Sequence, residues 1–290
     1  MIDLKDINEI SYHLKNKILK HDFISGSFGI NCIKIYLSNK KILICKFYSK
    51  KDPKSDAIIS EYKNLNYFTQ KKLNIFPKVI FNNNFYLITE FIQNNALKPN
   101  QTNKDLLQNI IKIHSIENNL YGFDFDTQIG GVIHSNKPNS NWANFYGETR
   151  LNFIFDLANK KNLLNLNTAF KIEKLIKNIN NFIPNNPKPL LLHGDLWEGN
   201  ILFNNGKFVS FIDPGSFFGH NELEIAYLRW FKPQFVDDDF LSKYNEYITI
   251  DKKYLSYENV YQLYYALCNV LLWDKSYERE VERLLNKIGL

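Results

Sequence analysis

One segment in the second half of the chain limits the possible folds more than any other. Residues 190–203 read LLLHGDLWEGNILF, so that Asp195 and Asn200 stand in the pattern H-x-D-x-x-x-x-N between two apolar runs. A further apolar run, residues 208–212, leads directly into Asp213. Short apolar runs bounded by turn residues are typical of buried strands. The sequence therefore predicts a polar loop and a carboxylate, both positioned by the ends of strands.

The residue types in this segment suit phosphoryl transfer to a hydroxyl group. An aspartate in this position of the loop accepts or orients the proton of the attacking hydroxyl, and the asparagine that follows can bind Mg²⁺ through its amide oxygen. Mg²⁺ prefers oxygen ligands and keeps several waters, so these ligands and the phosphates of a nucleotide suffice. We therefore expect Asp195 to be the catalytic carboxylate and Asn200 and Asp213 to be metal ligands. His193 is expected to organise the loop.

The N-terminal third has the pattern of a small sheet with two helices. The apolar spacing predicts an amphipathic helix in the first twenty residues and a second helix at residues 55–70. Runs of strand-like sequence begin near Phe23 and continue at residues 33–37, 42–48, 78–81 and 85–91. The expected fold class is α+β. It comprises a nucleotide-binding lobe with an antiparallel sheet over residues 1–92 and a mostly helical catalytic and substrate-binding lobe over residues 93–290.

Two charged residues of the N-terminal lobe fall on apolar faces. Lys46 shares a strand face with Ile42 and Ile44, and Glu61 lies on the apolar stripe of the following helix. An unpaired buried charge costs several kcal/mol. We therefore expect Lys46 to pair with Glu61 and to contact the nucleotide phosphates, as the strand lysine and helix glutamate of kinases do. The alternative is that Lys46 lies at a sheet edge and Glu61 is solvated.

Two backbone segments of the same lobe are candidates for nucleotide contacts. The turn at residues 25–29, SGSFG, could cover phosphates through the N–H groups of Gly26 and Ser27. It lacks the Lys-Ser/Thr ending of a Walker A motif, which disfavours a P-loop NTPase. A hinge strand would present backbone groups to adenine at Glu90, Phe91 and Ile92.

Composition narrows the partners and the compartment. The net charge is +6 with a pI near 8.9, but the lysines are scattered, so a nucleic-acid partner is disfavoured. The three cysteines, Cys32, Cys45 and Cys268, lack the spacing of a disulfide framework or a zinc site. Acidic residues interrupt the first twenty positions, and no window reaches the ~18 apolar residues of a membrane span. We expect a cytoplasmic protein with no membrane partner, and the pattern leaves the oligomeric state open.

With these residues in place, the chain resembles the fructosamine kinase (ketosamine-3-kinase) family, which is itself similar to the aminoglycoside and choline phosphotransferases. The similarity is densest in the loop at residues 192–203, where Trp197 follows Asp-Leu, and in residues 211–226, FIDPGSFFGHNELEIA. Upstream, residues 141–146, NWANFY, and the later Arg150 also match the order of that family. The turn at residues 25–29 departs from it, because the cysteine that some members carry there is replaced by glycine.

The resemblance implies a two-lobed protein-kinase-like fold with ATP and Mg²⁺ as cofactors. It also implies phosphorylation of the sugar 3-hydroxyl of a ketoamine, either a small molecule or a glycated protein lysine, as a deglycation repair step. Trp197 would contact this substrate or pack beneath the loop. His220 would donate a hydrogen bond to the substrate or to Asp213, or serve a structural role. Glu222 and Glu224 open a helix, where acidic residues suit the positive end of its dipole.

Two other functions remain open on the sequence alone. The first is a kinase of another small amine or amino alcohol, of the aminoglycoside or choline type, because the Asp195, Asn200 and Asp213 chemistry is common to all of them. The second is a catalytically silent nucleotide-binding module that keeps the fold. A protein kinase is disfavoured because Gly194 replaces the usual arginine of the loop.

Overall fold

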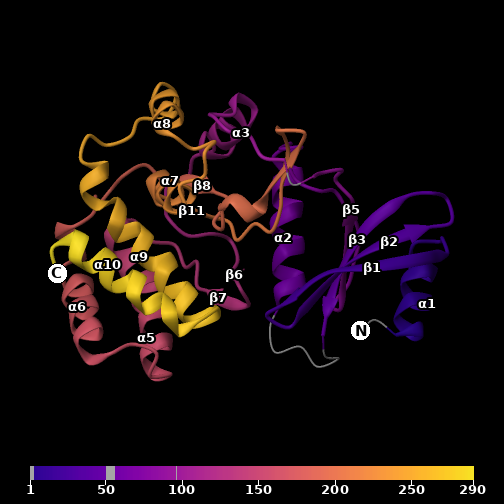
Figure 1. Cartoon of the computed structure of the whole chain (residues 1–290), viewed down its shortest axis with the longest axis horizontal. Coiled ribbons are helices and arrows are strands. Elements are labelled where there is room, and N and C mark those ends of the chain that lie inside the picture. The colour runs from indigo at the N-terminus through magenta and orange to yellow at the C-terminus, as the bar shows by residue number, and fades with distance from the viewer. Residues whose placement is uncertain (1–2, 50–55, 96) are drawn as a thin grey trace. The chain divides into compact units, whose positions relative to one another are not determined.

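The computed structural model describes residues 3–49, 56–95 and 97–290 (Figure 1). Packing divides the chain into two compact units. Unit 1 comprises Met1–Lys98, Thr127–Ile133 and Gly199–Gly215, and unit 2 comprises Pro99–Asp126, His134–Glu198 and Ser216–Leu290. The continuous first segment of unit 1 is therefore joined by two short segments from later in the chain.

Unit 1 is built on a five-stranded antiparallel sheet with the order β1-β2-β3-β5-β4. Its strands are β1 (Ile18–Ser27), β2 (Ile30–Leu37), β3 (Ile42–Tyr48), β4 (Val79–Asn82) and β5 (Tyr86–Glu90). The helices α1 (Leu4–His13) and α2 (Ala57–Gln70) lie on opposite sides of this sheet (Figure 1). The predicted α+β class, with its N-terminal antiparallel sheet, is confirmed. Ser55, where we placed the start of the second helix, lies outside the described residues.

The two faces of the sheet have different chemistry. Alternate residues of β2 and β3, including Ile35 and Cys45, are fully buried in an apolar core that Ile10 of α1 completes. Tyr86 fixes α1 on this face, because its hydroxyl donates to Asp6 Oδ1 at 2.6 Å. The residues of β3 that alternate with the buried ones point to the opposite face of the sheet, toward α2. Lys46 is one of these residues, so the period-two alternation of the strand places its charge on the α2 side.

Two short hairpins complete unit 1. β9 (Ile201–Asn204) pairs with β10 (Lys207–Phe211) through a tight turn in which Asn205 and Gly206 both have positive φ. This Asn-Gly pair is the preferred sequence for a two-residue hairpin turn. The second hairpin, β6 (Thr127–Ile129) with β7 (Val132–His134), was not predicted, because its strands are only 3 residues each.

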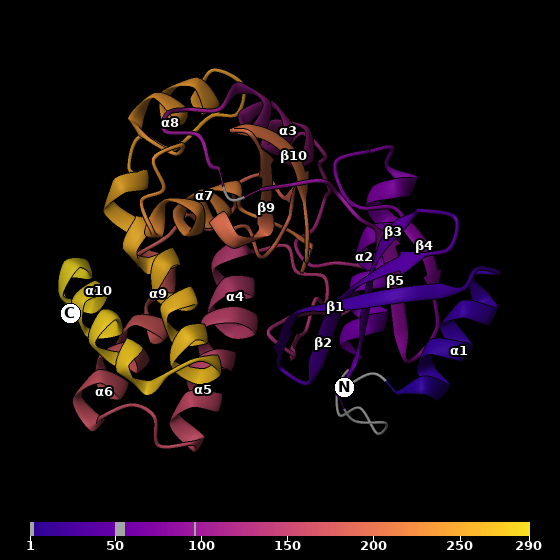
Figure 2. The same cartoon turned by 45° about the vertical axis from the view of Figure 1, so that its right-hand side comes forward.

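Unit 2 is mostly helical, as predicted. Its helices are α3 (Lys104–His114), α4 (Trp142–Tyr146), α5 (Phe153–Lys160), α6 (Leu166–Lys177), α7 (Asn221–Trp230), α8 (Asp238–Asn245), α9 (Tyr254–Leu272) and α10 (Glu278–Ile288). The long helix α9 is buried along most of its length and packs against α7 and α10 (Figure 2). The strands β8 (Leu190–Leu192) and β11 (Phe217–Gly219) pair beside α3 and α7. None of the helices in the described part of the chain combines the length and the hydrophobicity that crossing a membrane requires.

Candidate active site

The predicted catalytic motif is divided between the two units. The boundary falls between Glu198 and Gly199, so Asp195 and Trp197 belong to unit 2, whereas Asn200 and Asp213 belong to unit 1. The geometry around each group is therefore described within its own unit.

In unit 1, Lys46 contacts two carboxylates. Its Nζ atom donates to Glu61 Oε1 of α2 at 2.7 Å and also to Oδ1 of Asp213, which follows β10. The predicted pairing of Lys46 with Glu61 is therefore confirmed. The side chains of Lys46 and Glu61 are 17% and 18% exposed, whereas that of Asp213 is 43% exposed. Burial would lower the pKa of Lys46, but the Asp213 and Glu61 carboxylates outweigh it and hold that pKa above its ordinary value.

Asn200 and Asp213 are brought close by the β9–β10 hairpin. The carbonyl oxygen of Asn200 accepts the N–H of Ile212, the residue before Asp213, at 3.0 Å. Asp213 has a φ of 56°, in the left-handed region that costs energy for residues other than glycine and that often occurs at functional sites. The carboxylate of Asp213 and the side-chain amide of Asn200 both offer oxygen atoms at this hairpin. Oxygen ligands of this kind fit a cation such as Mg²⁺.

The turn with the predicted phosphate contacts is a tight β1–β2 hairpin. Ser27 pairs with Ile30, and the two residues between them, Phe28 and Gly29, have φ values of 48° and 82°. Gly26 has no side chain, which lets Asn31 of the neighbouring strand approach its backbone closely. A Cβ atom at position 26 would lie 2.9 Å from Oδ1 of Asn31, which is too close for a real side chain. The unpredicted β6–β7 hairpin lies against the same turn, because a Cβ atom on Gly131 would lie 3.4 Å from the Cβ of Phe28.

The predicted adenine segment lies at the end of β5. Glu90 is the last residue of that strand, and its N–H donates to the carbonyl oxygen of Lys78 at 3.0 Å. The ring of Phe91 is covered by Nζ of Lys34, 4.0 Å from its centroid. The carbonyl oxygen of Ile92 accepts from the Asn94 side chain at 2.7 Å. Contact of this segment with adenine stays a prediction.

In unit 2, the backbone around Asp195 is held by a buried carboxylate. Glu224 of α7 accepts the N–H of His193 at 3.0 Å and that of Gly194 at 2.6 Å. Gly194 has a φ of 88°, which lets the loop turn sharply before Asp195. Nδ1 of His193 accepts the N–H of Asp195 at 3.3 Å, which agrees with its expected role as a loop organiser.

Glu224 is in turn held by His114 of α3, whose Nε2 lies 2.8 Å from its Oε2. Burial alone would raise the pKa of Glu224, but its hydrogen bond and electrostatic interaction with His114, together with the interaction with His193 and the bond from Gly194, hold that pKa below its ordinary value. The expectation that Glu222 and Glu224 only favour a helix dipole was therefore incomplete. The signal in the sequence was an acidic pair inside a helix that is otherwise buried.

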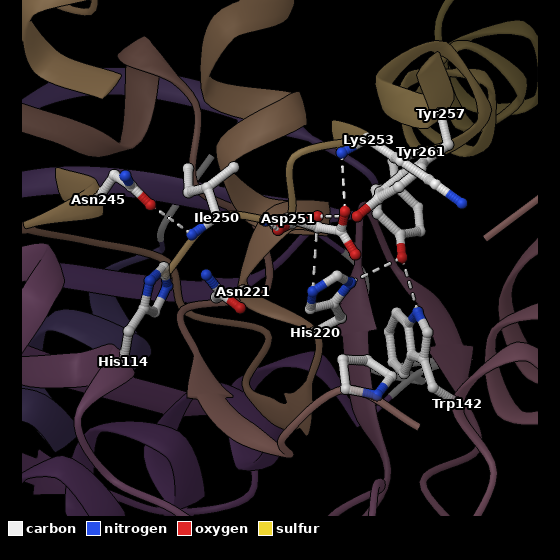
Figure 3. A network of polar contacts seen from close by, with 12 residues as sticks. His114, Trp142, His220, Asn221, Asn245, Ile250, Asp251, Lys253, Tyr257 and Tyr261 are labelled. Atoms are coloured by element: carbon white, nitrogen blue, oxygen red, sulfur yellow. Dashed lines mark hydrogen bonds and ion pairs between the residues drawn. The ribbon is translucent and has the colours of Figure 1, made fainter. Parts of the chain in front are cut away.

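His220 belongs to a second buried network, which Figure 3 shows. The indole Nε1 of Trp142 donates to the Tyr261 hydroxyl at 2.8 Å, and this hydroxyl lies 2.8 Å from Nδ1 of His220. The indole can only donate, so the Tyr261 hydroxyl accepts from Trp142 and makes its second bond with Nδ1 of His220. The other ring nitrogen of His220 is Nε2. That nitrogen lies 3.5 Å from Oε2 of Glu222. Burial lowers the pKa of His220 to about 3, so this imidazole is neutral.

Glu222 connects this network to the segment before α9. Its Oε1 accepts the N–H of Asp251 at 2.6 Å, and its Oε2 accepts the hydroxyl of Tyr257. Burial raises the pKa of Glu222 to about 7. Both ring nitrogens of His220 therefore face residues of its own unit. A direct contact of His220 with a substrate stays a prediction.

Trp197 lies on a partly exposed aromatic surface. Its ring centroid is 6.2 Å from that of Phe231, at the end of α7, and Phe231 is 43% exposed. Stacking of Trp197 on a sugar stays a prediction. By contrast, the distinctive Trp142 and Phe145 are fully buried, so their part in the motif is to pack the core of unit 2.

The comparisons with known proteins agree on one family. A model of the fructosamine kinase family matches residues 32–290, a range that contains every predicted site residue except Gly26 and Ser27. The chain is 30% identical over 207 residues to a probable ketoamine kinase of Enterococcus faecium (strain ATCC BAA-472 / TX0016 / DO), covering 69% of this chain and 70% of that protein. It is also 30% identical over 210 residues to the chloroplastic protein-ribulosamine 3-kinase of Arabidopsis thaliana, covering 69% of this chain and 61% of that protein.

Solved structures share the fold over nearly the whole chain. A protein of Thermobifida fusca YX-ER1 assigned as a fructosamine-3-kinase superposes with a TM-score of 0.86 at 20% identity, covering 98% of each chain. The ternary complex of the aminoglycoside phosphotransferase APH(2'')-IIa with streptomycin and ATP gives a TM-score of 0.66 at 17% identity, covering 99% of this chain and 97% of that one. These similarities confirm the predicted protein-kinase-like fold class. Together with the family match, they show that the chain belongs to the fructosamine kinase family, phosphotransferases with an alcohol group as acceptor.

Proposed function

We propose that this enzyme transfers the terminal phosphoryl group of ATP to the sugar 3-hydroxyl of a ketoamine. The observation that carries the proposal is the contact of Lys46 with both Glu61 and Asp213, because it joins the strand lysine, the helix glutamate and the metal-binding aspartate that a kinase needs. The ketoamine class is supported by the names of the relatives from Enterococcus faecium and Arabidopsis thaliana.

Lys46 and the hairpin residues would act on the nucleotide. Lys46 keeps its positive charge, so it can contact the phosphates of ATP while Glu61 fixes its direction. Asn200 and Asp213 would hold Mg²⁺, which neutralises charge on the phosphates when it is bound. Gly26 and Ser27 would offer backbone N–H groups to the phosphates, and the segment Glu90 to Ile92 would receive adenine.

Asp195 would act on the acceptor. Its carboxylate would accept or orient the proton of the 3-hydroxyl as that oxygen attacks phosphorus. The bonds from Glu224 to the backbone of His193 and Gly194 fix the loop that carries it, which supports a role that depends on accurate orientation. Trp197 would contact the acceptor. We assign His220 an indirect role, because its side chain is 6% exposed and bonded within the core.

The substrate panel that tests this proposal is magnesium-dependent ADP release with ribuloselysine, fructoselysine, choline and kanamycin as acceptors. The proposal predicts turnover on a ketoamine, dependence on Mg²⁺, and loss of turnover in Asp195→Ala. Comparing free ribuloselysine with a ribated protein then distinguishes a small-molecule substrate from a glycated protein lysine. The phosphorylated carbon of the product is identified by phosphorus-coupled NMR.

Two results would replace the proposal. Turnover on choline or kanamycin alone would retain the kinase mechanism and overturn the ketoamine assignment. ATP binding without turnover on any of the four acceptors would favour the silent nucleotide-binding module.

A further inference from the structure

Most of the short β6–β7 hairpin, Thr127–Ile133, belongs to unit 1, whereas the residues just before and after it belong to unit 2. Its strands are joined by Gly130 and Gly131, whose φ values are 55° and 76°. Positive φ at both central residues is the geometry of a two-residue hairpin turn that matches the twist of its strands. The hairpin is therefore a narrow element with a defined shape.

The tip of this hairpin packs on the β1–β2 turn, the segment with the predicted phosphate contacts. A Cβ atom on Gly131 would lie 3.4 Å from the Cβ of Phe28 and 3.6 Å from its carbonyl oxygen. Phe28 directly follows Ser27, whose backbone N–H is a candidate phosphate donor. The contact is made by the backbone of the hairpin, because glycine has no side chain to place between the two turns.

The strand β6 packs on the segment that follows Asp213. A Cβ atom on Gly215 would lie 2.9 Å from the carbonyl oxygen of Gln128 and 3.5 Å from Cγ1 of Ile129. A backbone oxygen in a strand cannot move aside as the end of a long side chain can, so this approach requires glycine. Gly215 is buried and only two residues from Asp213, so β6 restricts the movement of the turn that carries this carboxylate.

The side chain of Gln128 holds the start of α2. The first N–H groups of a helix have no acceptor within it, and in the described part of the chain the side chain of the N-cap residue Asp56 makes no capping bond. Instead, the side-chain oxygen of Gln128 accepts the N–H groups of Asp56 and Ala57, each at 3.2 Å, in the amide orientation that two facing donors require. The Tyr48 hydroxyl of β3 accepts the next N–H, at 3.2 Å. The helix that carries Glu61 is thus capped from outside.

Three segments with candidate nucleotide residues, the β1–β2 turn, α2 and the turn after Asp213, therefore contact one hairpin. We propose that the β6–β7 hairpin positions these segments for nucleotide binding, with Gln128 as the positioning residue for α2. By holding the start of the helix, Gln128 fixes the place along its axis at which Glu61 meets Lys46. The inference rests on the proposed function, which gives the phosphates and Mg²⁺ to these segments.

The test compares variants that differ in one hydrogen-bond acceptor. Gln128→Leu keeps the approximate size of the side chain and removes the acceptor, whereas Gln128→Glu keeps an acceptor. Asp3→Ala is the matched control, because it removes the cap of α1 on the other side of the same sheet, where the Asp3 side chain accepts the N–H of Asp6 at 2.8 Å. Calorimetric titration with ATP and Mg²⁺ gives the Kd of each variant. The KM for the ketoamine and the melting temperature are measured alongside.

We expect Gln128→Leu to raise the Kd for ATP about fivefold, the factor by which losing one helix cap shifts an equilibrium. Gln128→Glu stays within about twofold of the wild type, because its carboxylate accepts from the same N–H groups and suits the positive end of the helix dipole. Asp3→Ala lowers the melting temperature and leaves the Kd for ATP unchanged. The KM for the ketoamine is unchanged in all three variants.

An unchanged Kd in Gln128→Leu, or an equal rise in the Leu and Glu variants, would overturn the positioning role. An equal rise in Asp3→Ala would also overturn it, because any weakened helix of unit 1 would then have the same effect. If Gln128→Leu does not fold, Gln128→Asn takes its place, since its amide is one methylene shorter and does not reach both N–H groups. Weaker ATP binding in that variant supports the proposal and unchanged binding overturns it.

The proposed function fails in a different way. If the wild-type protein does not bind ATP, the assignment of the nucleotide site is wrong and the positioning role is wrong with it. If the wild-type protein binds ATP but does not turn over a ketoamine, only the acceptor assignment is wrong. The ATP titrations then still decide the role of Gln128.

Discussion

The two units support their candidate site residues in different ways. In unit 1 the charged group consists of Lys46, Glu61 and Asp213, which bond directly to one another. In unit 2 the loop that carries Asp195 depends on Glu224 of α7, and on His114 of α3 behind it. The first arrangement can be recognised in the sequence, because Lys46 and Glu61 are charged residues at positions where the hydrophobic period predicts apolar ones. The second arrangement can be recognised only in the structure, where helices distant in the sequence pack together.

The difference predicts that unit 1 variants affect nucleotide use most strongly. Lys46→Met removes the charge that contacts Glu61 and Asp213 and that would contact the phosphates. We expect kcat/KM for ATP to fall by about 10³-fold, the upper range for losing one preorganised electrostatic contact. Steady-state kinetics with varied ATP measure this effect. Lys71→Met, at the end of α2, is the control, and an equal loss in both variants would contradict the assignment.

A unit 2 variant should affect kcat and stability together. Glu224→Gln loses the ionised acceptor of two backbone N–H groups and the partner of His114. Losing a buried hydrogen bond to a charged acceptor costs about 1.5–3 kcal/mol, and the released loop should lower kcat by about a hundredfold. Urea unfolding and steady-state kinetics measure the two effects. A variant with full stability and unchanged kcat would show that this support is dispensable.

Glu222 should respond to pH in the opposite direction from Glu224. Its pKa is raised from 4.5 to about 7, so its contribution to stability is complete below pH 4.5 and is lost as the pH rises toward 7. The loss amounts to about 3 kcal/mol at 1.36 kcal/mol per unit. We therefore expect the free energy of unfolding, measured with urea, to fall less between pH 4.5 and pH 7 in Glu222→Gln than in the wild type. Glu224, with a lowered pKa, instead contributes stability above its unfolded pKa and loses it toward acid. An unchanged pH dependence in Glu222→Gln would show that another group causes the decline.

The smallest expected effect concerns the motif that most clearly marks the family. Trp142→Phe removes the indole N–H that donates to Tyr261 but keeps an aromatic ring in the core. The loss of one buried hydrogen bond should lower the free energy of unfolding by about 1–2 kcal/mol. Kinetics should show an unchanged KM for the ketoamine, and a large rise in that KM would indicate that Trp142 acts on the substrate site.

Much of the fold followed from local patterns. The strands of the unit 1 sheet are four to ten residues long, and in most of them the period-two alternation is visible in the sequence. The pairing of Lys46 with Glu61 was predicted from the cost of leaving either charge alone. The Asp195, Asn200 and Asp213 motif was recognisable because its chemistry requires those residue types at a fixed spacing.

The remaining features depend on contacts between distant residues. The hairpin of β6 and β7 is too short to show a period. His114 and Glu224 come from different parts of the sequence, and the bonds of Glu224 to His114 and to the backbone of His193 arise only when α3 and α7 pack beside β8. For the same reason the sequence left His220 open between a contact with the substrate, a contact with Asp213 and a structural role, whereas the structure places it in the interior, beside Tyr261 and Glu222.

The most direct test of the account is ketoamine-dependent ADP release by Asp195→Asn, which keeps the shape of the side chain and removes its charge. Asp156→Asn, an exposed change in α5, is the control. The account predicts that Asp195→Asn lowers kcat by about 10³-fold, within the usual range for a lost general base, while ATP still binds. Turnover by Asp195→Asn at the rate of the wild type would contradict it.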